Sequence, residues 1–105
     1  MNETEFRVLA EAAFDRLEAA LEACDAEIDW TQVGAGVVEL EFANGSKIVV
    51  NRHAAAREIW VAAKAGGFHF RWDGAHWRDT RDGRELFAAL AALISQQSGH
   101  SVRLD

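Results

Sequence analysis

The chain has 105 residues, half of them apolar, which allows one folded domain with one hydrophobic core and excludes a disordered protein. It holds one cysteine and no proline, so an internal disulfide and a CxxC metal or redox site are excluded. No apolar run approaches the roughly 20 residues of a membrane span. The opening residues, Met-Asn-Glu-Thr-Glu, lack the features of a targeting peptide. The simplest expectation is a cytosolic bacterial protein that does not act on a membrane.

The net charge of −6 hides an uneven distribution along the chain. Residues 1–45 contain eleven acidic and two basic residues, whereas residues 46–105 contain six acidic and nine basic residues, so the two parts carry −9 and +3. An anionic surface repels the phosphate backbone of nucleic acids and attracts cations or a basic protein surface. The first part therefore favours a cation or a basic protein as its ligand, and no nucleic-acid partner is expected.

The opening segment, from Glu3 to Asp29, is predicted to begin as an amphipathic helix. Its apolar residues repeat every three or four positions and so share one side of a helix: Phe6, Leu9, Ala10, Ala13, Phe14, Leu17 and Leu21. The acidic residues form a second stripe, roughly 120° around, that continues past the helix end: Glu11, Asp15, Glu18, Glu22, Asp25, Glu27 and Asp29. We call these seven residues the acidic ridge.

Like charges four residues apart on a helix cost a few tenths of a kcal/mol per pair, whereas a solvated helix face usually interleaves Glu with Lys. The acidic ridge contains such like-charge pairs despite their cost, which suggests that it binds a positively charged ligand. The residues alone still leave a merely solvated acidic face as the stronger interpretation.

Alternating apolar and polar residues predict a run of antiparallel strands after the helix. The predicted strands cover residues 28–33, 37–43, 46–51, 58–64, 68–72 and 75–79, with a loop over residues 52–57. Asn44-Gly45 and Asp73-Gly74 are typical of hairpin turns. Asp82 is predicted as an N-cap that forms a capping box with Glu85, and the helix that follows is predicted to stop at Gly99.

Helix, antiparallel strands, helix is the element order of an α+β fold. The expected architecture is a two-layer sandwich, with the N- and C-terminal helices packed on one face of a five- to six-stranded antiparallel sheet. We expect one domain that spans residues 1–105.

Trp60 alternates with Ile59 and Val61, so it is predicted to face solvent if its two neighbours face the helices. Tryptophan is typical of the energetic centre of a protein-binding surface. The alternative is that Arg57 or a neighbouring aromatic residue covers the indole. Three tryptophans are interpreted as structural: Trp30, Trp72 and Trp77. Cys24 is interpreted as structural or incidental. On the same sheet face as Trp60, His69 and Arg71 are expected to be exposed without a specific role.

Five segments of the chain carry a family resemblance. They are Met1-Asn2-Glu3-Thr4-Glu5-Phe6, Phe42-Ala43-Asn44-Gly45-Ser46-Lys47-Ile48, Asn51-Arg52, Ile59-Trp60-Val61-Ala62-Ala63-Lys64 and Gly66-Gly67-Phe68-His69-Phe70. In this order and over this length the chain resembles the frataxin family, and most closely the bacterial frataxins. It departs from the family pattern at His53, where glutamine is common, and at Ala55, near which bacterial members have proline. The loop before Gly34 is also about one residue shorter than is usual in the family.

The resemblance implies a protein of iron–sulfur cluster assembly that binds iron weakly through carboxylates of the first helix and first strand. It also implies docking on the cysteine desulfurase of that pathway through the acidic ridge, and regulation of the desulfurase rate. Carboxylate ligands by themselves would not distinguish iron from calcium, magnesium or manganese.

With the resemblance, the expected metal contacts are Glu18, Glu22 and Asp25, surrounded by Glu11, Asp15, Glu27 and Asp29, and Glu3 and Glu5 are further candidates. Glu18 and Glu22 are also expected to contact the desulfurase. Trp60, Asn51 and Arg52 are expected to contact the complex of desulfurase and iron–sulfur scaffold.

Two other functions stay open at this point. One is a ferroxidase-type protein that oxidises or stores iron, an activity proposed for the wider family, and the other is an acidic adaptor that is indifferent to metal. Dispersed carboxylates without a cleft favour binding over catalysis, so no enzyme and no catalytic residue is predicted. The expected state is a monomer, with iron-driven oligomers as an alternative.

Overall fold

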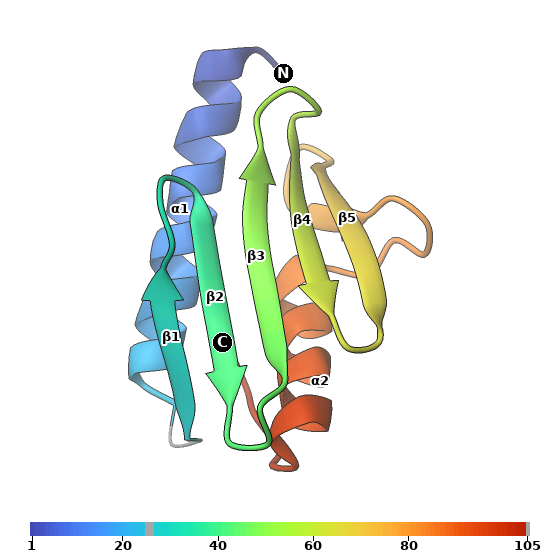
Figure 1. The fold of residues 1–105 in the computed structure, drawn as a ribbon. Coiled ribbons are helices and arrows are strands. Elements are labelled where there is room, and N and C mark those ends of the chain that lie inside the picture. Colours follow the sequence, from blue (N-terminus) through green and yellow to red (C-terminus); the bar gives the residue numbers. More distant parts are fainter. Residues whose placement is uncertain (25–26, 105) are drawn as a thin grey trace.

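A six-stranded antiparallel sheet carries two helices on one of its faces (Figure 1). The computed structural model describes residues 1–24 and 27–104. In chain order the elements are α1 (Glu3–Glu22), β1 (Ile28–Gln32), β2 (Val37–Phe42), β3 (Lys47–His53), β4 (Glu58–Ala63), β5 (Gly66–Trp72), β6 (Trp77–Asp79) and α2 (Leu86–Ser98). The strands follow one another in the sheet in chain order. The expected two-layer α+β sandwich is therefore confirmed.

Helix α1 begins and packs as its sequence predicts. The Asn2 side chain accepts a hydrogen bond from the Glu5 backbone N–H at 2.8 Å, and the Glu5 carboxylate accepts one from the Asn2 N–H, so the two residues form a capping box. The apolar stripe is buried against the sheet: Phe6, Ala10, Ala13, Phe14, Leu17 and Leu21. Because this stripe fixes the rotation of α1, the acidic stripe lies outside the core.

The strands bury every second residue on the helix side, as period-two alternation requires. Val38, Leu40, Ile48, Val50 and Ile59 are among the fully buried residues. Trp77 is also buried, and Trp30 and Trp72 pack against the core, which confirms their structural role. The opposite side of the sheet has no helix over it and faces the viewer in Figure 1. We call it the open face.

The start of α2 differs from the prediction. The N-cap is Glu85, whose carboxylate accepts hydrogen bonds from the Phe87 and Ala88 N–H groups. Asp82 instead accepts a hydrogen bond from the Arg84 N–H within the preceding loop. That loop is held against β6, since Asp79 N–H donates to the Arg84 carbonyl and the chain forms a bridge at Glu85. The Asp82 capping box is therefore wrong, whereas the stop at Gly99, in the left-handed conformation, is confirmed.

The predicted loop over residues 52–57 is also shorter than expected. Strand β3 continues through Arg52 and His53, which pair with Ile59 and Glu58 of β4. The polar and alanine-rich sequence hides this extension because pairing with β4, and not local propensity, makes these residues a strand. Strand β5 likewise begins two residues earlier than predicted, at Gly66.

Gln97 joins α2 to two turns of the sheet. Its amide nitrogen donates to the Ser46 hydroxyl at 3.0 Å and to the Lys47 carbonyl at 3.2 Å, and its side-chain oxygen accepts from the Lys64 N–H at 3.0 Å. Only 6% of Gln97 is exposed, so these bonds form away from water. The residue thus ties the β2–β3 and β4–β5 connections to the same end of α2.

We expect Gln97→Ala to lower the free energy of unfolding by about 2–3 kcal/mol, because it removes the hydrogen bonds that the buried Gln97 side chain makes to Ser46, Lys47 and Lys64. Urea denaturation measures this change. Gln96→Ala is the matched control, since Gln96 is an exposed neighbour on the same helix, and it should change stability by less than about 0.5 kcal/mol. Equal effects of the two substitutions would contradict the assigned role of Gln97.

Candidate functional site

Among the described residues, the acidic ridge is largely uncompensated by ion pairs with basic side chains. Glu11, Asp15, Glu22, Glu27 and Asp29 are exposed, Glu18 is half-buried, and Asp25 lies outside the described residues. Within the described part of the chain, the ridge makes one ion pair, a long one of 3.9 Å between Glu11 and Arg52. Glu18 accepts a hydrogen bond of 2.6 Å from the neutral Gln32 side chain. The ridge is therefore a surface of concentrated negative charge along α1 and β1.

Two further acids extend this negative surface onto the open face. Asp29 pairs with Glu41, and Thr31 pairs with Glu39, in the register of β1 and β2. Lys47 reaches both glutamates, with N···O distances of 3.1 Å to Glu39 and 3.8 Å to Glu41. The hydrogen bond to Glu39 and the charges of both carboxylates raise the pKa of Lys47 above its ordinary value. Glu39 and Glu41 were not among the predicted site residues, although their alternation with Val38 and Leu40 in the sequence places them on one face of the strand.

The acids of the ridge are spread out and do not enclose a metal site. Among residues 1–24 and 27–104, no three histidine, cysteine, aspartate or glutamate side chains come close enough to hold one ion. Glu11, Asp15 and Glu18 line a shallow cavity of about 140 Å³ together with Gln32 and Arg52. Carboxylate oxygens suit hard cations, and an open arrangement requires water to complete the coordination shell. This geometry could offer a hard cation only weak and exchangeable contacts.

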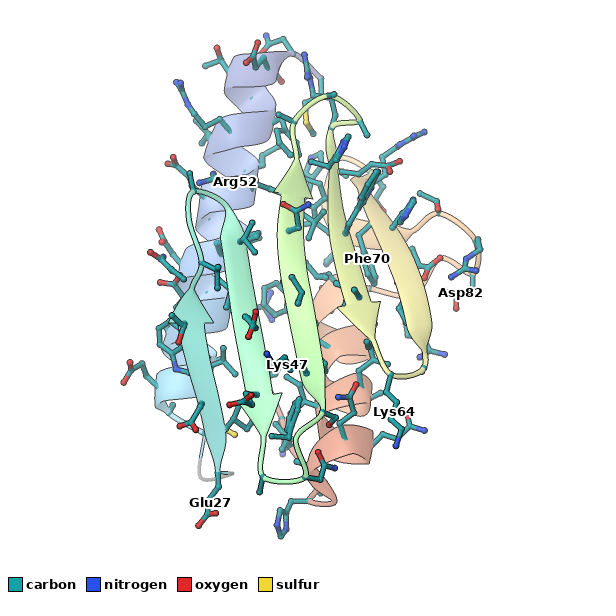
Figure 2. All side chains as sticks on the ribbon, in the orientation of Figure 1. Glu27, Lys47, Arg52, Lys64, Phe70 and Asp82 are labelled. Carbon is teal, nitrogen blue, oxygen red and sulfur yellow. The ribbon has the colours of Figure 1, made fainter. Side chains whose placement is uncertain are left out.

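Arg52 lies on the helix side of the sheet and not beside Trp60. It pairs with Ile59 and extends toward α1 near the end of β3 (Figure 2). Its side chain passes so close to Gly36 that a Cβ there would lie 2.5 Å from the Arg52 Cγ. Its guanidinium lies 5.6 Å from the Phe14 ring centroid. The expectation that Arg52 shares the surface of Trp60 is therefore corrected, since alternation along β3 sends Asn51 and Arg52 to opposite faces.

Trp60 lies on the open face, as predicted, but two histidines cover its ring. The His53 ring stacks on one side with a centroid distance of 3.8 Å and the His69 ring on the other at 4.4 Å, both within about 12° of parallel. The indole N–H donates to the Glu58 carboxylate at 2.8 Å. Trp60 is consequently half-buried and held in one orientation. His69 is exposed, as predicted, but the prediction that it has no specific role is wrong, because its ring stacks on Trp60.

The Glu58 carboxylate holds the Trp60 indole in place and is itself held by Arg71. It is only 5% exposed, and Arg71 donates to it from Nη2 at 2.6 Å and from Nε at 3.1 Å. Burial alone would raise the pKa of the Glu58 carboxyl, but the hydrogen bonds from Trp60 and Arg71 and the charge of Arg71 outweigh it and lower the pKa below its ordinary value of 4.5. We call these residues, with Asn51 opposite Trp60 in the register, the Trp60 platform: Asn51, His53, Glu58, Trp60, His69 and Arg71.

Comparison with known proteins agrees with the fold. Residues 1–100 match the family model of the frataxin-like domain. The chain belongs to the frataxin family. A protein of Dechloromonas aromatica named iron-sulfur cluster assembly protein CyaY is 61% identical over 104 residues, which cover 99% of each chain. A protein of Cupriavidus taiwanensis with the same name is 53% identical, over 97% of this chain and 95% of its own.

A solved frataxin from Psychromonas ingrahamii has the same fold, with a TM-score of 0.92 and 31% sequence identity over 100% of this chain and 99% of that one. In the described part of this frataxin, neither helix is long and apolar enough to cross a membrane.

The Glu58 carboxylate should make the stability of the protein sensitive to acid. Because its pKa is lower in the folded state than in the unfolded chain, its stabilising contribution is complete above pH 4.5 and is lost as the pH falls through the folded pKa. We expect Glu58→Gln to lower the free energy of unfolding at neutral pH and to flatten its decline below pH 4.5. Urea denaturation at a series of pH values measures both effects, and an unchanged pH profile in Glu58→Gln would contradict the role of this carboxylate.

The histidine stack predicts a specific pattern of proton resonances. The ring current of Trp60 should shift the imidazole protons of His53 and His69 upfield, and Trp60→Leu should return them to ordinary positions. His76 and His100, which are exposed and take no part in the stack, serve as internal controls. Unshifted His53 and His69 resonances in the unaltered protein would contradict the stacked arrangement.

Proposed function

We propose that this protein acts in iron–sulfur cluster assembly as an iron-binding regulator of the cysteine desulfurase. The observation that supports the proposal is the acidic ridge, whose carboxylates line α1 and β1 with one long internal ion pair among the described residues. The relatives that are named iron-sulfur cluster assembly proteins support the pathway. In this proposal the protein works as a monomer in the bacterial cytosol, without nucleic acid or membrane as a partner.

Iron is the cargo of the ridge in this proposal. Glu18, Glu22 and Asp25 bind it, and Glu11, Asp15, Glu27 and Asp29 form an outer set that holds further ions. Each ion keeps much of its water, because the exposed carboxylates lie along a helix and a strand instead of around a cavity. Such binding is weak, and either oxidation state of iron can be accommodated by oxygen ligands.

The desulfurase docks on the same ridge through a basic surface, with Glu18 and Glu22 at the contact. Complementary charge accelerates this encounter and orients the two proteins. The Trp60 platform contacts the complex of desulfurase and scaffold, with Asn51 and Trp60 at its centre, while Arg52 contributes from the end of the ridge. Since iron and desulfurase share carboxylates, the binding of each should change the affinity for the other by the same factor.

Charge reversal on the ridge tests both halves of the proposal. We expect Glu18→Lys/Glu22→Lys to weaken desulfurase binding by roughly tenfold to a hundredfold, because two attractive contacts become repulsive. Calorimetry with the desulfurase and an anaerobic titration with ferrous iron measure the two affinities. Asp82→Lys is the matched control for the single variant Glu22→Lys, because it makes an equal charge change in the β6–α2 loop on the other side of the molecule (Figure 2). Asp82→Lys should leave the affinities for the desulfurase and for iron unchanged.

The outcomes separate the remaining functions. If both affinities persist in the double variant, the ridge is not the site. If desulfurase binding falls while ferrous iron binds neither form at physiological salt, the protein is an acidic adaptor that is indifferent to metal. If the protein consumes oxygen with ferrous iron at a rate above that of iron alone, it is a ferroxidase.

A further inference from the structure

The two edge strands of the sheet, β6 and β1, differ in length and in how they are covered. At one edge, β6 has only three residues, and the loop after it covers the strand through a bridge between Arg78 and Glu85 and a hydrogen bond from Asp79 N–H to the Arg84 carbonyl. At the other edge, β1 has five residues that pair without a bulge to β2 (Figure 1). Strand β1 is therefore the longer of the two edge strands of this sheet.

Alternation of the ladder shows which backbone groups of β1 face outward. Val33 N–H donates to the Val37 carbonyl at the end of the β1–β2 pair. Hydrogen-bonded positions alternate in an antiparallel pair, so Asp29 and Thr31 also bond to β2, while the N–H and C=O groups of Ile28, Trp30 and Gln32 point away from it. Within residues 1–24 and 27–104, no protein group bonds to these outward groups.

Natural sheets usually protect such an edge with lysine, proline or a bulge. The sequence of β1, Ile-Asp-Trp-Thr-Gln, contains neither lysine nor proline. Negatively charged side chains protect this edge instead. Two copies of β1 placed side by side would bring the Asp29 carboxylates of the two copies onto adjacent strands, beside the Glu41 of each copy, so negative charge disfavours pairing of this edge with itself.

Acidic side chains flank the β1 edge on both faces of the sheet. On the helix side, the hydrogen bond to Gln32 holds Glu18 beside the edge, and Asp15 lines the same cavity. On the open face, Asp29 is exposed on β1 next to Glu41. The side chains of a strand added to β1 would point alternately to these two sides, so each would meet negative charge.

We propose that the free edge of β1 binds an extended segment rich in lysine and arginine from a partner protein, by adding it to the sheet as a seventh strand. Backbone hydrogen bonds to Ile28, Trp30 and Gln32 fix the segment, and the acids on both faces select its basic side chains. The inference rests on the proposed docking at the acidic ridge. It adds that the partner segment pairs with the backbone of β1, which attraction between charges alone would not require.

A short peptide that repeats Lys-Lys-Thr places lysines on both faces of the sheet and tests this mode. The expected result is binding at low salt, with slower hydrogen exchange at the outward amides of Ile28, Trp30 and Gln32. The same peptide with alternate backbone nitrogens methylated keeps its charge but cannot donate to β1. We expect it to bind at least roughly tenfold more weakly, because several backbone hydrogen bonds are lost. A peptide that repeats Glu-Glu-Thr should not bind.

Equal affinity of the methylated and unmethylated peptides, or unchanged exchange at the outward amides in the bound state, would overturn strand addition while leaving ridge docking intact. Absence of peptide binding would overturn it as well. Failure of the docking proposal is recognised separately, by desulfurase affinity that is insensitive to Glu18→Lys/Glu22→Lys. Asp29→Lys, at an exposed position, should abolish peptide binding while the thermal unfolding transition is retained.

Discussion

The burial of the apolar stripe of α1 against the sheet is the constraint on which the candidate site depends. Phe6, Phe14 and Leu17 fix the rotation of the helix, and a rotation that would hide its acids would expose these three side chains to water. Burying side chains of this size is worth about 1.5–3 kcal/mol each, far more than the few tenths lost to each pair of like charges on the helix surface. Packing therefore holds the acidic ridge in place, and mutual repulsion of the carboxylates is too weak to disperse it.

The two parts of the proposed surface are built in opposite ways. In the acidic ridge the charges are spread, solvated and weakly paired, which leaves them free to exchange ligands. In the Trp60 platform the indole is held by two imidazoles and by Glu58, and Glu58 is held by Arg71. A pre-oriented aromatic group loses little conformational entropy when a partner covers it. The ridge can thus attract a partner from a distance, and the platform can define how that partner sits.

The sequence predicts elements that depend on local pattern and misses those that depend on pairing. The stripe of α1, the alternation of β2 and the glycine stop of α2 were all predicted from spacing, because one buried face decides them. Asp82 fails as an N-cap because the loop before α2 is bonded to β6, and Arg52 and His53 become strand because β4 lies beside them. The stack of His53, Trp60 and His69 requires the register of three strands, which no local pattern contains.

The central claim is that positive ligands bind where packing has concentrated negative charge. An anaerobic NMR titration with ferrous iron, followed by addition of the desulfurase, tests it most directly. Iron should first perturb backbone amides of the second half of α1 and of β1, while those of the Trp60 platform stay unchanged. The desulfurase should then perturb the same amides of α1 and β1. Responses centred on α2, or scattered evenly over the protein, would contradict binding at the acidic ridge.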